Sequence, residues 1–272
     1  MSSSGFKTKK SLGQNFLQDD FTIESIADAC GAGPEDTVVE IGPGLGVLTD
    51  ALAERAGRVV AVELDDRLIP ILRTKFALID NVEIVHEDIL KFDWSRVCGV
   101  ETDSAAPDKL CIVGNLPYYI TTPILLGILE KKVPAEKITV MVQKEVADRI
   151  VAEPGGKDYG VLSISLQYYG RTEKVLDVPR EFFKPVPNVD SAVVTLELKK
   201  ERPLCGQMEE KFFRLVKQAF SQRRKTLLNS LNGFDGLGKQ DIERILYSQE
   251  IDPNRRAETL SVEDYIKLCK EM

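Results

Sequence analysis

The sequence is poor in the residues that build metal sites and disulfide frameworks. It holds one histidine and five cysteines in 272 residues. The cysteines are odd in number, and no two have the C-x-x-C spacing. Neither a zinc site nor a disulfide scaffold is therefore indicated, and we expect no metal. Cysteine usage of this kind fits a reducing compartment, so we expect a cytoplasmic protein.

Long apolar runs are also lacking. No stretch approaches the roughly 18 consecutive apolar residues of a membrane-spanning helix, and no apolar signal-peptide core follows the lysines near the start. The composition, 43% hydrophobic and 29% charged, is ordinary for a globular chain. We expect a soluble monomer with no membrane partner.

An overall excess of positive charge is missing as well. The formal net charge of −7 excludes a uniformly basic nucleic-acid binder. Positive charge is instead segregated, because residues 1–18 and 211–234 contain lysine and arginine but no acid. We predict phosphate contacts from these segments, although the solvated face of an amphipathic helix over 211–231 would explain the second one. The candidate residues are Lys7, Lys9, Lys10, Arg223, Arg224 and Lys225.

A polar and aromatic tetrapeptide, Asn115-Leu116-Pro117-Tyr118, follows the apolar run 110–114. The amino group of adenine is a poor nucleophile, because its lone pair is delocalised into the ring. The side-chain oxygen of Asn115 and the backbone carbonyl of Leu116 offer acceptors for its two protons. Pro117 stiffens the turn, and Tyr118 offers a face for stacking a base. The pattern indicates chemistry on a nucleobase; a strand that ends in a proline turn is the alternative.

A glycine-rich turn follows a buried strand predicted over 37–41. The glycines stand at Gly42, Gly44 and Gly46, whereas a dinucleotide fingerprint would require one at position 47, which is Val47. Pyrophosphate binding is therefore disfavoured. Gly42 and Gly44 still remove side chains where a ligand approaches the backbone, although a purely structural turn would also use them.

Acidic residues end the next two predicted strands. Glu63 lies 21 residues beyond Gly42, near the spacing at which a carboxylate binds ribose hydroxyls. Asp88 and Ile89 follow the third strand. Strand ends of this kind describe a nucleoside site at the carboxyl edge of a parallel sheet, and an adenosine without a pyrophosphate suggests S-adenosylmethionine. The alternatives are a helix N-terminal acid for Glu63 and an N-cap for Asp88.

Taken together, these motifs resemble those of the class I S-adenosylmethionine-dependent methyltransferases. Within that class the chain looks like the ribosomal RNA adenine dimethyltransferases of the small-subunit type, over nearly its whole length. The segments that carry the resemblance are 13–17, 40–44, Glu63, 87–88, 115–118, 183–191 and 219–227.

The resemblance implies roles for further residues. Asn15 and Leu17 would belong to a lid over the methionine end of the cofactor, and Asp88 with Ile89 would bind its adenine. Asn115 would serve both the cofactor and the target base. Phe183 would be a second stacking ring, although the sequence alone favours a core phenylalanine. His86 is expected to be a packed strand residue rather than a catalytic base.

The reaction implied is dimethylation of two adjacent adenosines near the 3′ end of 16S ribosomal RNA, within the assembling pre-30S particle. The basic residues named above would then bind RNA. One rival is methylation of 23S ribosomal RNA, as in enzymes of the antibiotic-resistance type. Another is a non-catalytic assembly or transcription factor on the same fold.

The expected fold is α/β, a Rossmann-like sheet of about seven strands followed by a small α-helical domain. We predict a catalytic, cofactor-binding domain over 1–200 and a helical RNA-binding domain over 201–272. The predicted strands are 37–41, 58–64, 82–85, 110–114, 138–142, 163–169 and 192–198.

Overall fold

The computed structural model describes residues 14–98, 109–222 and 224–272. The chain divides into two compact units. The first contains the residues up to Ala147 together with Thr172–Leu198, and the second contains Asp148–Arg171 and Lys199–Met272. Residues 148–171 thus group with the C-terminal helices, whereas the prediction divided the chain once, after residue 200.

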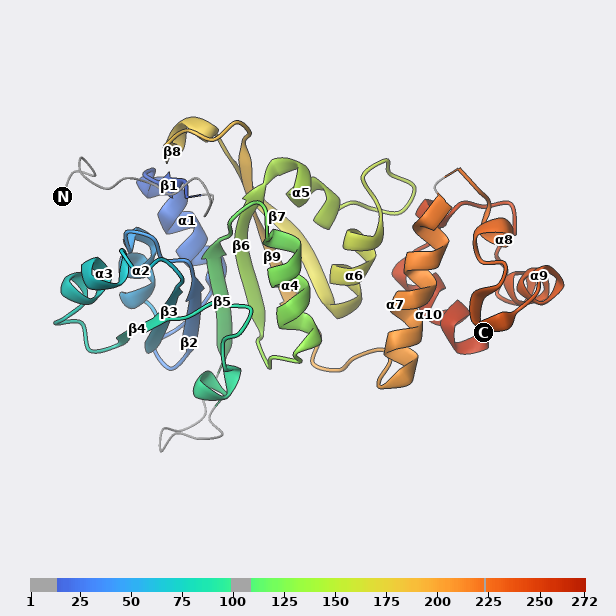
Figure 1. The fold of residues 1–272 in the computed structure, drawn as a ribbon, viewed down its shortest axis with the longest axis horizontal. Helices are drawn as coiled ribbons and strands as arrows, with labels where there is room; N and C mark the ends of the chain where they lie inside the picture. The colour runs from blue at the N-terminus through green and yellow to red at the C-terminus, as the bar shows by residue number, and fades with distance from the viewer. Residues whose placement is uncertain (1–13, 99–108, 223) are drawn as a thin grey trace. The chain divides into compact units, whose positions relative to one another are not determined.

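The first unit is built on a seven-stranded sheet with the order β4-β3-β2-β5-β6-β9-β7 (Figure 1). The strands from β4 to β6 pair in parallel, and β9 is antiparallel to β6. The predicted α/β class and the number of strands are confirmed. The strands are β2 (Thr37–Ile41), β3 (Arg58–Glu63), β4 (Val82–His86), β5 (Leu110–Asn115), β6 (Lys137–Gln143), β7 (Gly170–Val178) and β9 (Ser191–Leu198).

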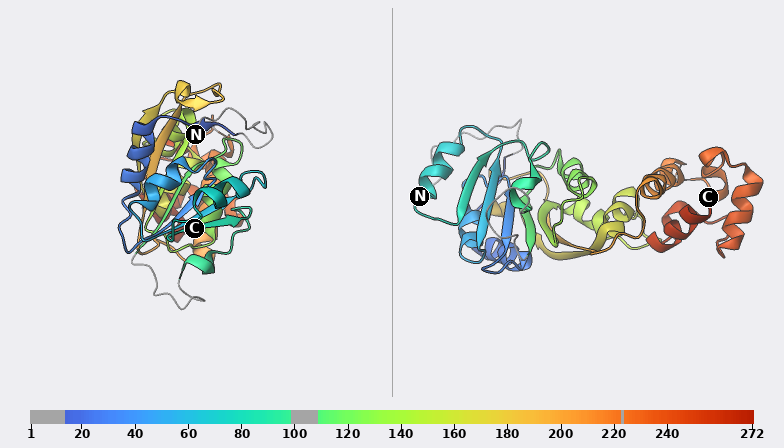
Figure 2. Two further views of the ribbon diagram at one scale, coloured as in Figure 1. Left: turned by 90° about the vertical axis from the view of Figure 1, so that its left-hand side faces the viewer. Right: turned by 90° about the horizontal axis from the view of Figure 1, so that it is seen from below.

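Helices cover both faces of this sheet, which explains why its central strands are predominantly apolar. Every residue of β2 is buried. Helices α1 (Asp20–Cys30) and α2 (Val47–Ala53) pack against each other, and α1 also contacts β5 and β6. The views in Figures 1 and 2 place α4 (Thr121–Glu130) on the opposite face from α1.

The strand order reverses beside β2, which has β3 on one side and β5 on the other. In open α/β sheets the connections leave in opposite directions at such a point, so a crevice opens at the carboxyl ends of the strands. The glycine turn, Glu63 and Asn115 all lie at those ends. The fold therefore brings the predicted motifs to one edge.

The prediction of a strand over 163–169 is wrong, because these residues belong to helix α6 (Val161–Tyr169). The alternation of Ser163, Ile164 and Ser165 suggested a half-exposed strand, yet all three are buried. The Ser163 hydroxyl donates to the Arg149 carbonyl at 2.5 Å, which satisfies a buried polar group. The seventh strand is β7, an edge strand whose charged residues hid its alternation.

A small two-stranded sheet joins distant parts of the first unit. In it β1 (Phe16–Leu17) pairs antiparallel with β8 (Phe183–Lys184), and Leu17 is opposite Phe183. His86, expected to be packed, is exposed, because it ends the edge strand β4. The remaining elements of this unit are α3 (Ile69–Lys75), the 3-10 helices η2 (Trp94–Val97) and η3 (Arg180–Phe182), and the first residues of α5 (Lys144–Ile150).

The second unit is helical over the residues that the structure describes, apart from the first residues of β7. A ring cluster of Tyr168, Tyr169, Phe212 and Phe213 joins α6 to α7, with Tyr168 stacked on Phe212 at 4.6 Å between centroids. The elements after residue 200 are α7 (Gln207–Ala219), η4 (Phe220–Gln222), α8 (Leu227–Ser230), η5 (Phe234–Gly236), α9 (Lys239–Ser248), η6 (Ala257–Thr259) and α10 (Val262–Glu271).

Candidate active site

A cavity of about 1310 Å³ opens at the carboxyl ends of β2, β3 and β5, in the first unit. This is where the reversal of strand order predicts a ligand. Eleven of the residues predicted as catalytic or cofactor-binding line it. They are Asn15, Leu17, Gly42, Gly44, Glu63, Asp88, Ile89, Asn115, Leu116, Pro117 and Tyr118.

The glycine turn has three residues with positive φ, at which side chains other than hydrogen are strained. The φ angles are +67° at Gly42, +60° at Gly44 and +74° at Gly46. A Cβ on Gly46 would lie 2.7 Å from the Phe76 ring, so this glycine is required by packing. A Cβ on Gly42 would meet nothing within 4 Å. The backbone at Gly42 is therefore open to a close approach from the cavity.

Glu63 at the end of β3 connects two loops around the cavity. Its side chain accepts hydrogen bonds from the backbone N–H of Gly44, at 3.2 Å, and of Asp65, at 2.8 Å. Burial raises its pKa, and hydrogen bonds from the backbone N–H groups of Asp65, Gly44 and Leu64 oppose that rise. A carboxylate has about four acceptor positions, so Glu63 can bind a hydroxyl group as well.

Glu40 is a cavity residue for which the sequence analysis predicted no role. It is only 1% exposed in β2, and the hydroxyl of Thr49 donates to its carboxylate at 2.5 Å. Burial raises the pKa of Glu40 to about 7. An acid inside the apolar run Thr-Val-Val-Glu-Ile was the signal that could have identified it.

Asp88 and Ile89 follow β4, which pairs with one side of β3, the strand that ends in Glu63. The glycine turn follows β2, which pairs with the other side of β3. The Oδ1 atom of Asp88 accepts from the Leu90 N–H at 3.0 Å, so the local capping interaction anticipated for this residue is present. Its Oδ2 atom makes no hydrogen bond with the described residues. Ile89 is buried beside it. The pair thus offers one open acceptor and an apolar surface.

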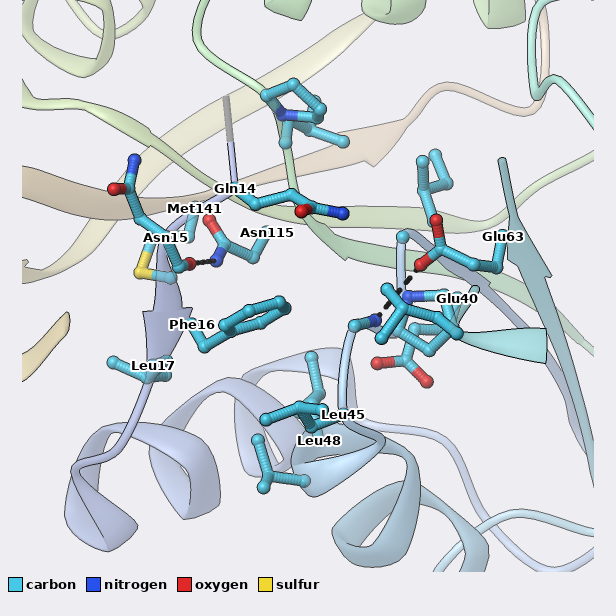
Figure 3. A pocket seen from close by; sticks show the side chains of 18 of the residues that line it. Gln14, Asn15, Phe16, Leu17, Glu40, Leu45, Leu48, Glu63, Asn115 and Met141 are labelled. Atoms are coloured by element: carbon cyan, nitrogen blue, oxygen red, sulfur yellow. Dashed lines mark hydrogen bonds between the residues drawn. The ribbon is translucent and has the colours of Figure 1, made fainter. Parts of the chain in front are cut away.

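The amide of Asn115 is oriented by the N-terminal segment. Its Nδ2 donates to the backbone carbonyl of Asn15 at 3.1 Å, and a carbonyl can only accept (Figure 3). The Oδ1 atom is therefore directed elsewhere as an acceptor. The N–H of Leu116 donates to Met141, whereas the Leu116 carbonyl makes no hydrogen bond with the described part of the chain. Two acceptors on adjacent residues thus border the cavity.

The turn that presents the Asn115 and Leu116 oxygens is held in place by hydrogen bonds of the next two residues, Pro117 and Tyr118. The Pro117 carbonyl accepts from the Ile120 N–H at 3.1 Å and from the Thr121 hydroxyl at 3.2 Å. The Tyr118 hydroxyl is hydrogen-bonded to the Ser191 hydroxyl at 2.7 Å. Burial raises the pKa of Tyr118, so the phenol is neutral at physiological pH. The hydrogen bond holds the ring in one orientation, as a stacking surface requires.

The N-terminal segment is anchored across the cavity at several points. Gln14 donates to Asp65 at 2.7 Å, and Arg67 donates to the same carboxylate at 2.9 Å. These hydrogen bonds hold the pKa of Asp65 well below its usual range. Figure 3 shows the Phe16 ring between Asn115 and the side of the cavity that carries Glu63. A Cβ on Gly44 would lie 3.0 Å from that ring. Neither Gln14 nor Phe16 was predicted to have a role in the site.

Phe183 is not brought into the cavity. It is 2% exposed and packs with Leu17 in the core of the first unit, whereas its neighbour Lys184 lines the cavity. The pairing of β8 with β1 accounts for this, because successive side chains of a strand point to opposite faces. The structure gives Phe183 the core position that its sequence alone favoured.

The basic candidates lie elsewhere. Arg224 and Lys225 are exposed between α7 and α8 in the second unit. Lys7, Lys9, Lys10 and Arg223 lie outside the described residues. Within the described ranges no group of three or more His, Cys, Asp or Glu side chains is arranged to hold a metal ion. Over the same ranges no helix has the length and apolar character needed to cross a membrane.

Solved structures resemble this one over almost its full length. A structure described as 23S rRNA methyltransferase ErmE superposes with a TM-score of 0.74 at 30% identity, covering 94% of this chain and 99% of its own. A dimethyladenosine transferase from Plasmodium falciparum gives a TM-score of 0.78 at 24% identity, over 93% and 95% of the two chains. The fold is that of the class I S-adenosylmethionine-dependent methyltransferases, as predicted.

Sequence comparisons agree with the structural ones. A curated protein named ribosomal RNA small subunit methyltransferase A, from Geobacillus thermodenitrificans, is 49% identical over 271 residues, which are 98% of this chain and 92% of the relative. Residues 5–272 match the family model described as ribosomal RNA adenine dimethylase. The chain therefore belongs to the ribosomal RNA adenine dimethylase family.

Proposed function

We propose that this protein uses S-adenosylmethionine to dimethylate the exocyclic amino groups of two adjacent adenosines near the 3′ end of 16S ribosomal RNA. The observation that carries the proposal is the pair of acceptors at the end of β5. The Asn115 amide nitrogen is engaged by the Asn15 carbonyl, so its oxygen is left beside the Leu116 carbonyl at the cavity.

These two oxygens match the two N–H groups of an adenine amine. Accepting both protons draws the nitrogen towards a tetrahedral shape and localises its lone pair, so no strong general base is required. The ring of Tyr118, held by Ser191, offers the stacking surface for a base removed from its helix. A singly methylated amine keeps one N–H, so one of the two acceptors still positions it for a second transfer.

The remaining cavity residues fit S-adenosylmethionine. Gly42 leaves space beside the backbone, Glu63 offers acceptors for ribose hydroxyls, and Asp88 offers one for an adenine amine, next to the apolar Ile89. Asn15 and Leu17 would close over the methionine end. When bound, the cofactor supplies a methyl group activated by a sulfonium. The protein's part is to position the amine and to exclude water.

The small-subunit substrate is preferred because the relative at 49% identity is named for it, whereas the 23S methyltransferase structure is 30% identical. We place the reaction in the cytoplasm, on the assembling pre-30S particle, with a monomeric enzyme. Lys7, Lys9, Lys10, Arg223, Arg224 and Lys225 are proposed to contact RNA phosphates.

The test is transfer of tritiated methyl groups to undermethylated small ribosomal subunits. We expect label in 16S RNA with the unchanged enzyme and a loss of kcat on the order of 100-fold with Asn115→Ala, the usual effect of removing one group that stabilises a transition state. Tyr118→Phe, which keeps the stacking ring but loses its hydrogen bond to Ser191, should lower activity far less than Asn115→Ala does.

Different outcomes would identify the rivals. Label confined to 23S RNA would favour the large-subunit activity of the resistance type. No label in either RNA would favour a non-catalytic factor. Full activity of Asn115→Ala would contradict the acceptor mechanism even if the substrate were correct.

A further inference from the structure

A second hollow, of about 560 Å³, lies within the second unit, between α7, α8 and the turn that follows α8. Four of its ten lining residues carry side-chain amides, namely Gln218, Gln222, Asn229 and Asn232, and Arg214 and Phe234 also line it. The amides of Gln222 and Asn232 make no hydrogen bond with the described residues. The hollow therefore presents unused donors and acceptors beside an arginine.

Arg214 is held in one geometry. Its Nη1 donates to Asp235 Oδ1 at 2.9 Å and its Nη2 to Oδ2 at 3.4 Å, the bidentate arrangement that fixes a guanidinium plane. Its Cζ lies 5.8 Å from the centroid of the Phe234 ring, which is 3% exposed. The Arg214 side chain nevertheless remains 62% exposed. A planar cation is thus fixed from one side and open to solvent.

Asp235, which makes this contact, lies in the left-handed backbone region, where aspartate is found more often than most residues. Its φ is +47°, an unusual value for a residue other than glycine, and it stands between Phe234 and Gly236. Positive φ values at Gly233 and Gly236 complete a tight turn.

The chemistry of the hollow favours a nucleobase over a bare phosphate. Asp235 occupies the Nη1 and Nη2 edge of Arg214, the edge that would grip an anion in a bidentate manner, and Asp235 also lies 3.9 Å from Lys211. Amide side chains instead match the hydrogen-bonding edges of bases, and guanidinium planes stack on bases that have left a helix. Lys217, exposed at the rim, is suited to the phosphate that accompanies such a base.

We propose that this hollow is an accessory site for an unpaired nucleobase of RNA, which stacks on the Arg214 guanidinium and is hydrogen-bonded by Gln222 and Asn232. The inference rests on the proposed action on RNA and adds a binding position to it. It is separate from the proposed phosphate contacts of Arg224 and Lys225, because it predicts a preference for a base rather than for charge.

The probe is a short RNA duplex with one extrahelical uridine, compared by fluorescence anisotropy with the same duplex carrying an abasic nucleotide at that position. A uridine is used because the catalytic cavity is proposed to take adenine. We expect the full-length protein to prefer the uridine duplex on the order of tenfold, the usual contribution of one stacked base. Arg214→Lys keeps the charge but lacks the plane, so it should abolish the preference.

Arg244→Lys is the matched control, because Arg244 is another exposed arginine of this unit, paired with Asp241 at 3.0 Å and absent from the hollow. It should keep the preference, as should Asn115→Ala. Equal affinity of the unchanged protein for both duplexes, or a preference that survives Arg214→Lys, would overturn the inference. A preference lost only in Asn115→Ala would place the base in the catalytic cavity instead. Methyl transfer to small subunits, measured in parallel, tests the proposed function on its own.

Discussion

Glu40 is a carboxylic acid that the fold holds in an almost dry position beside a ligand cavity. Its hydrogen bond from Thr49 supplies part of the solvation that burial removes, and its pKa still rises to about 7. The side chain is therefore largely protonated at mildly acid pH. Near pH 7 its ionisation therefore depends on the charge and polarity of the ligand in the cavity.

The raised pKa of Glu40 predicts a stability that falls as pH rises. Between its ordinary value of 4.5 and about 7, the unfolded chain loses this proton while the folded chain keeps it. The free energy of unfolding should therefore decrease across that window by about 3 kcal/mol from Glu40 alone, and then stay level. Urea unfolding from pH 4.5 to 8 measures this decrease, and Glu40→Gln should remove it. An identical pH dependence in the variant would contradict the prediction.

Individual site residues could be predicted from the sequence where their position at a strand end, or the chemistry of their side chain, indicated a ligand. Glu63 was predicted because carboxyl ends of parallel strands meet at one edge, whereas Asn115 was predicted from the hydrogen-bond acceptors of its tetrapeptide. Phe16 and Gln14 were not, because their positions depend on contacts with Gly44 and Asp65 that are distant in sequence. Phe183 shows the converse, since a motif residue was placed in the core by the pairing of β8.

The strand–turn–helix element around Gly42 contains two glycines whose substitution should have different effects. Gly46 has positive φ and no room for a side chain, whereas Gly42 has positive φ and open space. A substitution at Gly42 therefore strains the backbone without a clash inside the protein. Any additional effect must come from a ligand.

Gly42→Ala should weaken S-adenosylmethionine binding beyond its effect on stability. The backbone strain should cost about 1 kcal/mol of unfolding free energy. Gly31→Ala is matched to it, with φ of +69° against +67° at Gly42 and only ordinary contact for the new Cβ. Calorimetric titration should show at least about a tenfold loss of cofactor affinity for Gly42→Ala and none for Gly31→Ala. Similar affinity in both variants would mean that the cofactor does not approach this glycine.

Helices and strands were predicted correctly where the hydrophobic period and the length of the apolar run indicated the same type of element. The buried strands β2, β5 and β6 are short apolar runs that match neither a long helix nor a loop. Helix α6 was mistaken for a strand because Leu162 to Leu166 alternates polar and apolar residues, while its burial on all sides depends on packing in the second unit. Strand β7 was missed because the residues between its buried ends alternate only between exposed and half-buried, so its sequence shows no regular apolar face.

Across the whole molecule, charge opposes the proposed partner. A net charge of −7 repels RNA at long range, so binding requires local positive segments. Arg224 and Lys225 are exposed and belong to the acid-free segment 211–234. Their contribution should therefore be electrostatic and independent of RNA sequence.

Neutralising Arg224 and Lys225 to glutamine should weaken RNA binding and flatten its dependence on salt. Each lost phosphate contact lowers the slope of log affinity against log salt by about 0.9, so the double variant should lose nearly 2. Cofactor affinity should not change, because these residues do not line the cavity. Titrations of small-subunit RNA at several salt concentrations measure the slope, with Lys239→Gln/Arg244→Gln on α9 as the charge-matched control. If both double variants reduce the slope equally, the effect is one of net charge, and Arg224 and Lys225 are merely part of a solvated surface.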